Sequence, residues 1–229
     1  MNFISSDNIE KIISMLKDEV TKYIAKKNTL GKKTNEETNL DIDNNIKNYL
    51  NKKYPYYVFF SGKSGNYNID PTMPTWVISP IASTLDSTHK LEHKAISLAL
   101  VYENDSLFGA VYIPSTDELF YAVKEKGAFL NGKKITASNT SSIDITDNMY
   151  DSRPTSSAAI HICHVATGKA DMYLRDKIRP WDYAAATCII EEAGGKITTT
   201  TNGILTYYTK ANILATNGLI HESLLPLIN

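Results

Sequence analysis

Five short segments between residues 56 and 123 constrain the fold most strongly. They are rich in β-branched and aromatic residues, and turn residues separate them. Their sequences are YYVFF, TWVIS, AISLALVY, LFGAVYI and ELFYAV. Shortly after them, Asn131-Gly132 is the dipeptide most typical of a tight hairpin turn. The pattern therefore predicts an antiparallel sheet in the first part of the chain.

Two helices are expected before this sheet. Asp7 and Glu10 resemble a capping box, and apolar residues recur at helical spacing, so residues 7–26 predict an amphipathic helix. The segment GKKTNEETN is interpreted as a polar loop. A second helix is predicted to start at Asp43 and to end before Pro55.

The pattern changes after about Ser138. A polar segment, SNTSSIDITDN, marks a boundary. Beyond it, residues 157–166 and 183–193 have helical patterns that end near glycines, and ADMYL, GKITTT and NILAT predict strands. We therefore expect a helix pair with an antiparallel sheet over residues 1–135, and a smaller α/β part over 136–229.

Charge and cysteine content limit the possible partners. The net charge is −1 and no block of like charges occurs, which argues against a nucleic acid or anionic membrane as partner. The two cysteines lie in apolar helical patterns, which suits buried thiols. The first residues include acids where a signal peptide needs bases, and no apolar run reaches about 18 residues. A cytoplasmic location is expected.

Four longer motifs resemble those of the inositol monophosphatase family, in the same order and at similar spacing. The most specific is the last, because a Trp-Asp pair opens a small-residue helix that closes on Glu-Ala-Gly-Gly. The motifs are WVISPIAST, GAFLNGKKITAS, HVATGKADMYL and WDYAAATCIIEEAGG. The resemblance spans nearly the whole chain and implies a layered αβαβα sandwich with the activity of a Mg²⁺-dependent phosphomonoesterase.

The resemblance also implies where metal ligands belong, and most are missing. In the family, a Gly-Glu-Glu-Ser segment supplies a glutamate and an Asp-Pro-Ile-Asp-Gly-Thr loop supplies two aspartates. The corresponding segments here are residues 61–64 and 79–84. Gly62, Ser79 and Ala82 stand at the three acidic positions.

One metal carboxylate of the family pattern is retained, at Asp182. Thr84 and Asp43 match supporting catalytic positions. Two Mg²⁺ ions about 4 Å apart need several carboxylates, so a single one predicts very weak or absent hydrolysis. No cofactor is expected, unless acids such as Asp86 or Glu37 replace the missing ligands and hold Mg²⁺.

Anion binding is the function that the loop retains. Ser83 and Thr84 open the next expected helix, whose first N–H groups attract phosphate. Lys63 lies beside a lost ligand position, and Arg175 occupies the place of a substrate-contacting glutamate of the family. Both cations favour an anionic ligand, although an exposed loop lysine and an exposed turn arginine are equally good interpretations.

Two aspartates and two histidines also have a structural interpretation. Asp182 equally suits the N-cap of a helix over 183–193, and capping is preferred for Asp43 because its partners are missing. His161 and His164 are three residues apart on a predicted helix, a spacing that can hold a metal, but no third ligand is evident.

The preferred function is that of a non-hydrolytic or regulatory homologue with an impaired metal site, which binds a phosphorylated small molecule. The first alternative is an active Mg²⁺-dependent phosphatase of inositol phosphates, sugar phosphates or nucleotide bisphosphates with rearranged ligands. The second is a metal-independent enzyme that reuses the pocket. The resemblance also implies a homodimer.

Overall fold

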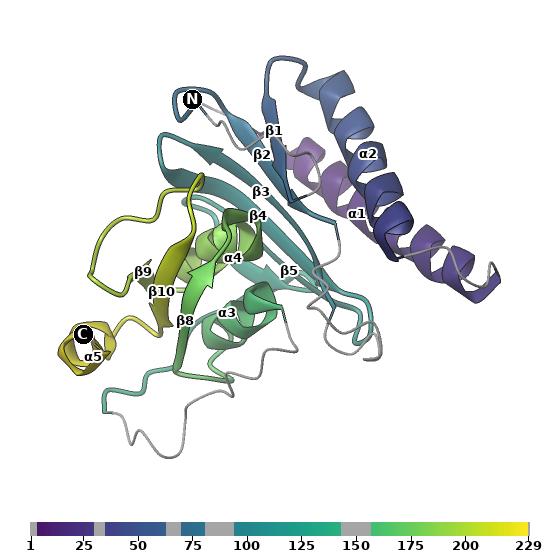
Figure 1. Ribbon diagram of the computed structural model, residues 1–229. Helices are drawn as coiled ribbons and strands as arrows, with labels where there is room; N and C mark the ends of the chain where they lie inside the picture. Colours follow the sequence, from purple (N-terminus) through teal and green to yellow (C-terminus); the bar gives the residue numbers. More distant parts are fainter. Residues whose placement is uncertain (1–3, 30–34, 63–69, 81–93, 143–156, 229) are drawn as a thin grey trace.

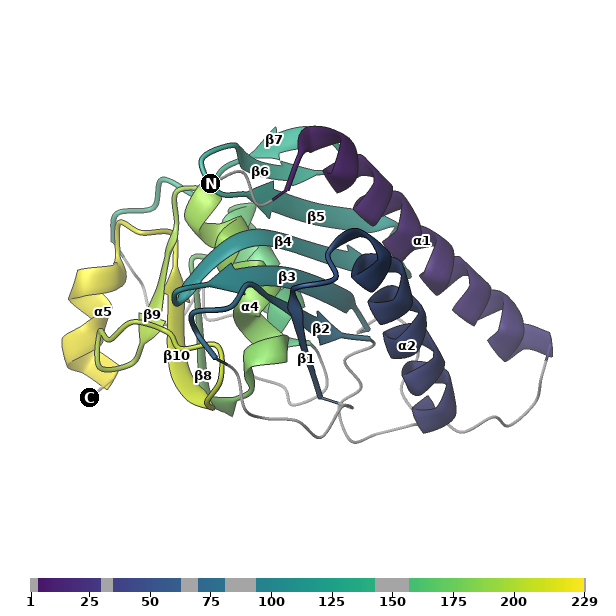
Figure 2. The same cartoon turned by 90° about the horizontal axis from the view of Figure 1, so that it is seen from above.

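The protein is described by a computed structural model, over residues 4–29, 35–62, 70–80, 94–142 and 157–228. A helix pair, a seven-stranded sheet, a second helix pair, a three-stranded sheet and a last helix are stacked in that order (Figures 1 and 2). This is the αβαβα sandwich predicted from the motifs. The helices are α1 (Ser6–Thr29), α2 (Asn35–Lys53), α3 (Ala158–Ala166), α4 (Pro180–Glu192) and α5 (His221–Ile228).

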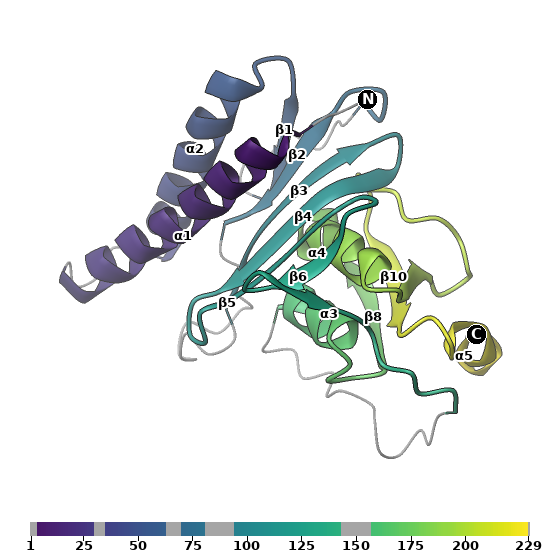
Figure 3. The same ribbon diagram turned by 180° about the vertical axis from the view of Figure 1, so that it is seen from behind.

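The first helix pair covers one face of the large sheet, opposite to α3 and α4 (Figure 3). On α1, Ile12, Leu16 and Val20 follow one another at intervals of four and are fully buried. Helix α2 starts at Asn35, so the predicted start at Asp43 was wrong by two turns. Residues 35–42 contain no glycine or proline and include two glutamates, which favour the first turns of a helix.

The large sheet has its strands in chain order. Its first two strands are parallel and the remaining neighbours antiparallel, so the prediction of a wholly antiparallel sheet was wrong for that pair. Asn131 and Gly132, both at positive φ, form the predicted tight turn between the last two strands. The strands are β1 (Val58–Ser61), β2 (Thr75–Ser79), β3 (Ile96–Tyr102), β4 (Asp105–Ile113), β5 (Glu118–Val123), β6 (Gly127–Leu130) and β7 (Lys133–Ile135).

Helix α4 lies very close to the large sheet. A Cβ atom added to Gly109 of β4 would lie 2.0 Å from the carbonyl oxygen of Ala185, so only glycine fits there. The Ser106 hydroxyl also donates a hydrogen bond to the Ala184 carbonyl, at 2.9 Å. The sequence of β4 thus fixes the height of α4 above the sheet, and with it the position of the helix start.

The small sheet is antiparallel and consists of β8 (Met172–Ile178), β10 (Ala211–Thr216) and β9 (Lys196–Thr199), in that order. Helix α5 packs on its outer face through Leu224 and Leu225. The sequence did not predict α5, because it is short and Pro226 lies inside it. None of the described helices is both long and apolar enough to span a bilayer.

Candidate functional site

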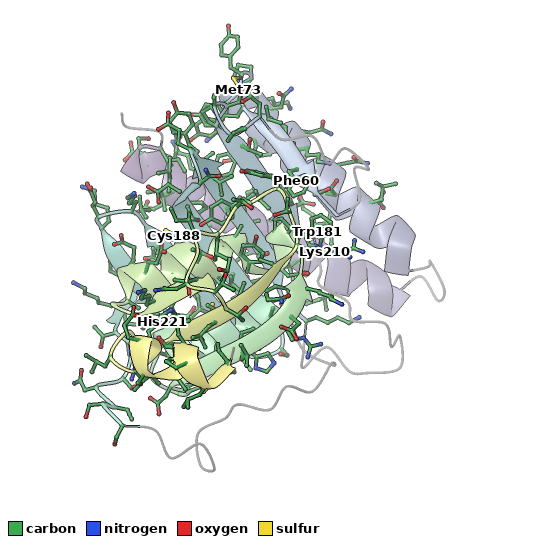
Figure 4. The ribbon with its side chains drawn as sticks, turned by 60° about the vertical axis from the view of Figure 1, so that its left-hand side comes forward. Phe60, Met73, Trp181, Cys188, Lys210 and His221 are labelled. Carbon is green, nitrogen blue, oxygen red and sulfur yellow. The ribbon has the colours of Figure 1, made fainter. Side chains whose placement is uncertain are left out.

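The carboxyl ends of β1 and β2 and the start of α4 meet at one edge of the large sheet. Because β1 and β2 are parallel, Ser61 and Ser79 both end their strands at this edge. Gly62 follows β1 and lies against the indole of Trp181, where an added Cβ would be 2.9 Å from Cε2. The Trp181 ring also packs on Phe60, with ring centroids 5.4 Å apart (Figure 4).

Ser79 is 4% exposed and lies next to this contact. Alternation along β2 places Val77 in the core between the sheets, so Ser79 faces the same side, toward α4. Its cross-strand partner Ser97 donates a hydrogen bond to the carbonyl oxygen of Trp181, at 3.2 Å. Gly62, Ser79 and the start of α4 therefore lie close together. Gly62 and Ser79 are not acids, and the start of α4 carries Asp182.

Asp182 is the carboxylate at this edge, and its helix starts earlier than predicted. Helix α4 begins at Pro180, so Asp182 is the third helical residue and not the N-cap. Its carboxylate accepts a hydrogen bond from the backbone N–H of Arg179, at 3.4 Å. An acid at the third helical position that binds the N–H of the N-cap residue is one half of a capping box. Burial raises the pKa of Asp182 to about 6, although the Arg179 N–H and the Arg179 charge oppose the rise.

This raised pKa predicts a pH-dependent effect of Asp182→Asn. A group with a raised folded-state pKa stabilises the fold at low pH, and this stability is lost as the pH rises through about 6. Asparagine stays neutral, so in chelator the variant should gain stability over the parent between pH 4 and pH 7, by up to about 3 kcal/mol. Urea unfolding at both pH values measures this.

Asp176→Asn is the matched control, because Asp176 is exposed on β8. Urea unfolding of this variant at both pH values gives the reference against which the Asp182→Asn difference is compared. An equal difference at both pH values for Asp182→Asn would show that its carboxyl group is not desolvated.

Asp43 is buried in the middle of α2 and does not cap a helix, so that interpretation was wrong. The side chain is 1% exposed, and Oδ2 accepts from Lys47 Nζ at 2.5 Å and from the Ser61 hydroxyl at 3.1 Å. Among the described residues, Oδ1 has no hydrogen-bond partner. Lys47 follows Asp43 by four residues, a spacing at which side chains on a helix interact. The pair was not predicted, because Asp43 was placed at the start of the helix.

This cluster does not provide a nucleophile for a metal-independent reaction. Ser61 Oγ lies 3.4 Å from Lys47 Nζ, a distance at which a base can act, but Ser61 is fully buried. Its hydroxyl donates to Asp43, and Lys47 is paired with the same carboxylate. A substrate atom cannot approach Ser61 in this state.

Several predicted residues lie outside the described parts of the chain. These are Lys63, Ala82, Ser83, Thr84 and Asp86, and nothing is described of the Glu37 side chain. Their assignments as phosphate-binding, catalytic or replacement residues stay predictions. Lys94, which the sequence did not single out, is 8% exposed and precedes β3 at the edge where β2 ends.

The two histidines of α3 do not form a metal centre with described residues. His161 stacks on Tyr173, with ring centroids 5.2 Å apart and an angle of 10° between the rings. Burial lowers the pKa of His164, and the positive charge of Lys169 adds to this effect. No group of three or more His, Cys, Asp and Glu side chains suited to a metal ion occurs in the described ranges.

The described residues do not fit a pair of Mg²⁺ ions. At the strand ends, Asp182 offers a carboxylate and Ser79 a hydroxyl, and Trp181 lies against Gly62. The Asp43 carboxylate beside Ser61 is neutralised by its ion pair with Lys47. Mg²⁺ prefers near-octahedral oxygen ligands, and two ions need several shared carboxylates. No reaction step is therefore assigned to a metal at this site.

Comparison with solved structures defines the class of fold. An IMPase from Thermotoga maritima superposes with a TM-score of 0.80 at 25% identity, covering 97% of each chain. A dual specific IMPase/NADP phosphatase bound with D-inositol-1-phosphate gives 0.85 at 20% identity, over 99% of this chain and 97% of that one. The layered fold is that of the inositol monophosphatases.

Sequence comparison gives the family itself. The model of the inositol monophosphatase family matches residues 2–155 and 145–229. Inositol monophosphatase 1 of Rattus norvegicus is 31% identical over 215 residues, which are 81% of this chain and 78% of the relative. The chain belongs to the inositol monophosphatase family. Members of this family are Mg²⁺-dependent phosphatases.

Proposed function

We propose that this family member binds the phosphate group of a phosphorylated small molecule without Mg²⁺, and that it hydrolyses phosphomonoesters very slowly or not at all. The observation that carries the proposal is the contact between Trp181 and Gly62, because the indole occupies the space that a metal-binding glutamate at position 62 would need. Ser79 offers a neutral hydroxyl at the second position. The protein would then act as a non-hydrolytic or regulatory homologue.

Cationic side chains near the strand ends support metal-independent anion binding. Lys94 is almost fully buried there, where β3 begins beside the end of β2. Lys63 follows Gly62 in the sequence. A fixed ammonium group stabilises an anion without a bound metal.

The ligand class is inferred from structural neighbours. The dual specific IMPase/NADP phosphatase holds D-inositol-1-phosphate, and a structure of an IMPase/NADP phosphatase holds NADP with Ca²⁺. For this chain we propose the shared chemistry, a phosphomonoester on a small polar molecule. A nucleic acid or a membrane is not proposed, since the net charge is −1. A homodimer is part of the proposal on family grounds.

A phosphatase assay with Asp182→Asn tests the loss of hydrolysis. With Mg²⁺ and a panel of inositol, sugar and nucleotide phosphates, the parent should release phosphate within about twofold of the variant, because one carboxylate does not assemble a two-ion site. Colorimetric phosphate release is the measurement. Robust Mg²⁺-dependent turnover that disappears in Asp182→Asn would establish the active alternative.

A binding measurement in chelator tests the other half of the proposal. Inorganic phosphate should raise the melting temperature of the parent in EDTA, in a saturable way. Chloride at the same ionic strength is the control for non-specific screening. No response to phosphate with EDTA, together with a response when Mg²⁺ is added, would contradict metal-independent binding.

A further inference from the structure

Cationic residues gather where β8 ends and α4 begins. Arg175 and Lys177 belong to β8, and Arg179 is the N-cap of α4. Ala211 of β10 pairs with Ile178, so Lys210 comes next to this segment from the neighbouring strand. The acids among these positions are Asp176 and Asp182, so cations are in excess around the start of α4.

Arg175 points into the layer between the two sheets. Its cross-strand partner is Ile213, which is fully buried in the central core, and directly paired residues share a face of the sheet. Tyr173 lies two residues earlier on the same face and is 5% exposed. Arg175 itself is half-buried at this position of β8.

Arg175 and Asp182 lie within electrostatic reach of the same hydroxyl group. Burial raises the pKa of Tyr173 to about 12, while the Arg175 charge opposes this rise and the Asp182 charge adds to it. The arginine of β8 and the aspartate of α4 therefore both act on Tyr173, although they come from different elements.

Trp181 connects this cationic group with the strand ends. The Arg179 guanidinium carbon lies 5.1 Å from the centre of the indole, and Gly62 is in contact with the same side chain. The Arg179 guanidinium and the residue that follows β1 therefore contact the same indole.

We propose that the ligand carries a second anionic group, a phosphate or a carboxylate, and that Arg175 and Arg179 bind this group. The inference rests on the proposed function, because the first phosphate occupies the ends of β1 and β2. Guanidinium groups hold phosphate and carboxylate oxygens in a forked geometry that a lysine does not reproduce. The resemblance implies a glutamate at position 175, which would repel such a group. The arginine at this position therefore raises the affinity for phosphorylated acids and bisphosphates relative to monophosphates of neutral cyclitols.

Three phosphorylated six-carbon ligands test the inference in EDTA. Glucose 6-phosphate carries one anionic group, 6-phosphogluconate adds a carboxylate, and glucose 1,6-bisphosphate adds a second phosphate. Isothermal titration calorimetry at fixed ionic strength should give at least tenfold tighter binding for the two doubly anionic ligands. Arg175→Gln should remove most of this advantage and leave the affinity for glucose 6-phosphate nearly unchanged.

Two more variants make the test specific. Arg179→Gln changes an exposed side chain, so it should fold normally and reduce the advantage by itself. Lys169→Gln removes a cation that pairs with Glu118 at 3.0 Å, away from the site, and should change nothing. Equal affinity for all three ligands, or an equal loss for all three in Arg175→Gln, would overturn the inference. If neither inorganic phosphate nor glucose 6-phosphate binds, the proposed function itself fails.

Discussion

Replacing Gly109 with alanine should destabilise the protein by about 3 kcal/mol, at the upper end for overpacking of a core. The added Cβ would lie 2.0 Å from the carbonyl oxygen of Ala185. Neither atom can rotate away, because the oxygen belongs to the backbone and the position of a Cβ is fixed by the backbone. Helix α4 must then rise from the sheet and lose contacts along its length. For a chain of this size, the melting temperature should fall by roughly 6 to 12 °C. Thermal unfolding by circular dichroism measures the change.

Gly132→Ala provides the contrasting control. Gly132 has a φ of +80° and no atom within 4 Å of an added Cβ, so only backbone strain opposes alanine there. We expect a cost of about 1 kcal/mol. Equal effects of the two substitutions would mean that the contact between α4 and β4 is looser than described.

Restoring the acidic positions together should create a response to Mg²⁺. The variant carries Gly62→Glu, Lys63→Glu, Ser79→Asp and Ala82→Asp in addition to the native Asp182. Its carboxylates repel one another, so it should be less stable than the parent in chelator. Saturating Mg²⁺, at about 100 times the dissociation constant, should then add about 2.7 kcal/mol. Melting temperature against Mg²⁺ concentration gives the readout.

The matched control has the corresponding amides, Gly62→Gln, Lys63→Gln, Ser79→Asn and Ala82→Asn. It adds the same side-chain volume against Trp181 without the charge, and should not respond to Mg²⁺. A parent protein that gains as much stability from Mg²⁺ as the acidic variant would reveal a metal site outside the residues discussed. No response in either variant would indicate that the loop has lost its geometry together with its acids.

Local patterns were sufficient for most elements of the fold. The strand segments, the Asn131-Gly132 turn and the glycines after α3 and α4 depend on near neighbours in the sequence, and all appear in the structure. The four motifs, through their resemblance to the inositol monophosphatase family, also predicted the order of the layers. They also identified Gly62 and Ser79 as the positions without acids, at the edge where β1 and β2 end.

Two features that depend on distant contacts were missed, and the start of one helix was misplaced. The parallel pairing of β1 with β2 follows from the crossover between them and not from the composition of either strand. The start of α2 was placed two turns late, because a polar first segment of a helix resembles a loop. The contact of Trp181 with Gly62 joins positions more than one hundred residues apart, and no periodicity indicates it.

That contact also has an evolutionary consequence. A single mutation that placed glutamate at position 62 would have to displace the Trp181 indole, and the new acid would stand without carboxylates at positions 79 and 82. The change would therefore cost stability before any metal site could form. A four-carboxylate site needs several substitutions at once, so no path of single stabilising steps leads to one from this sequence.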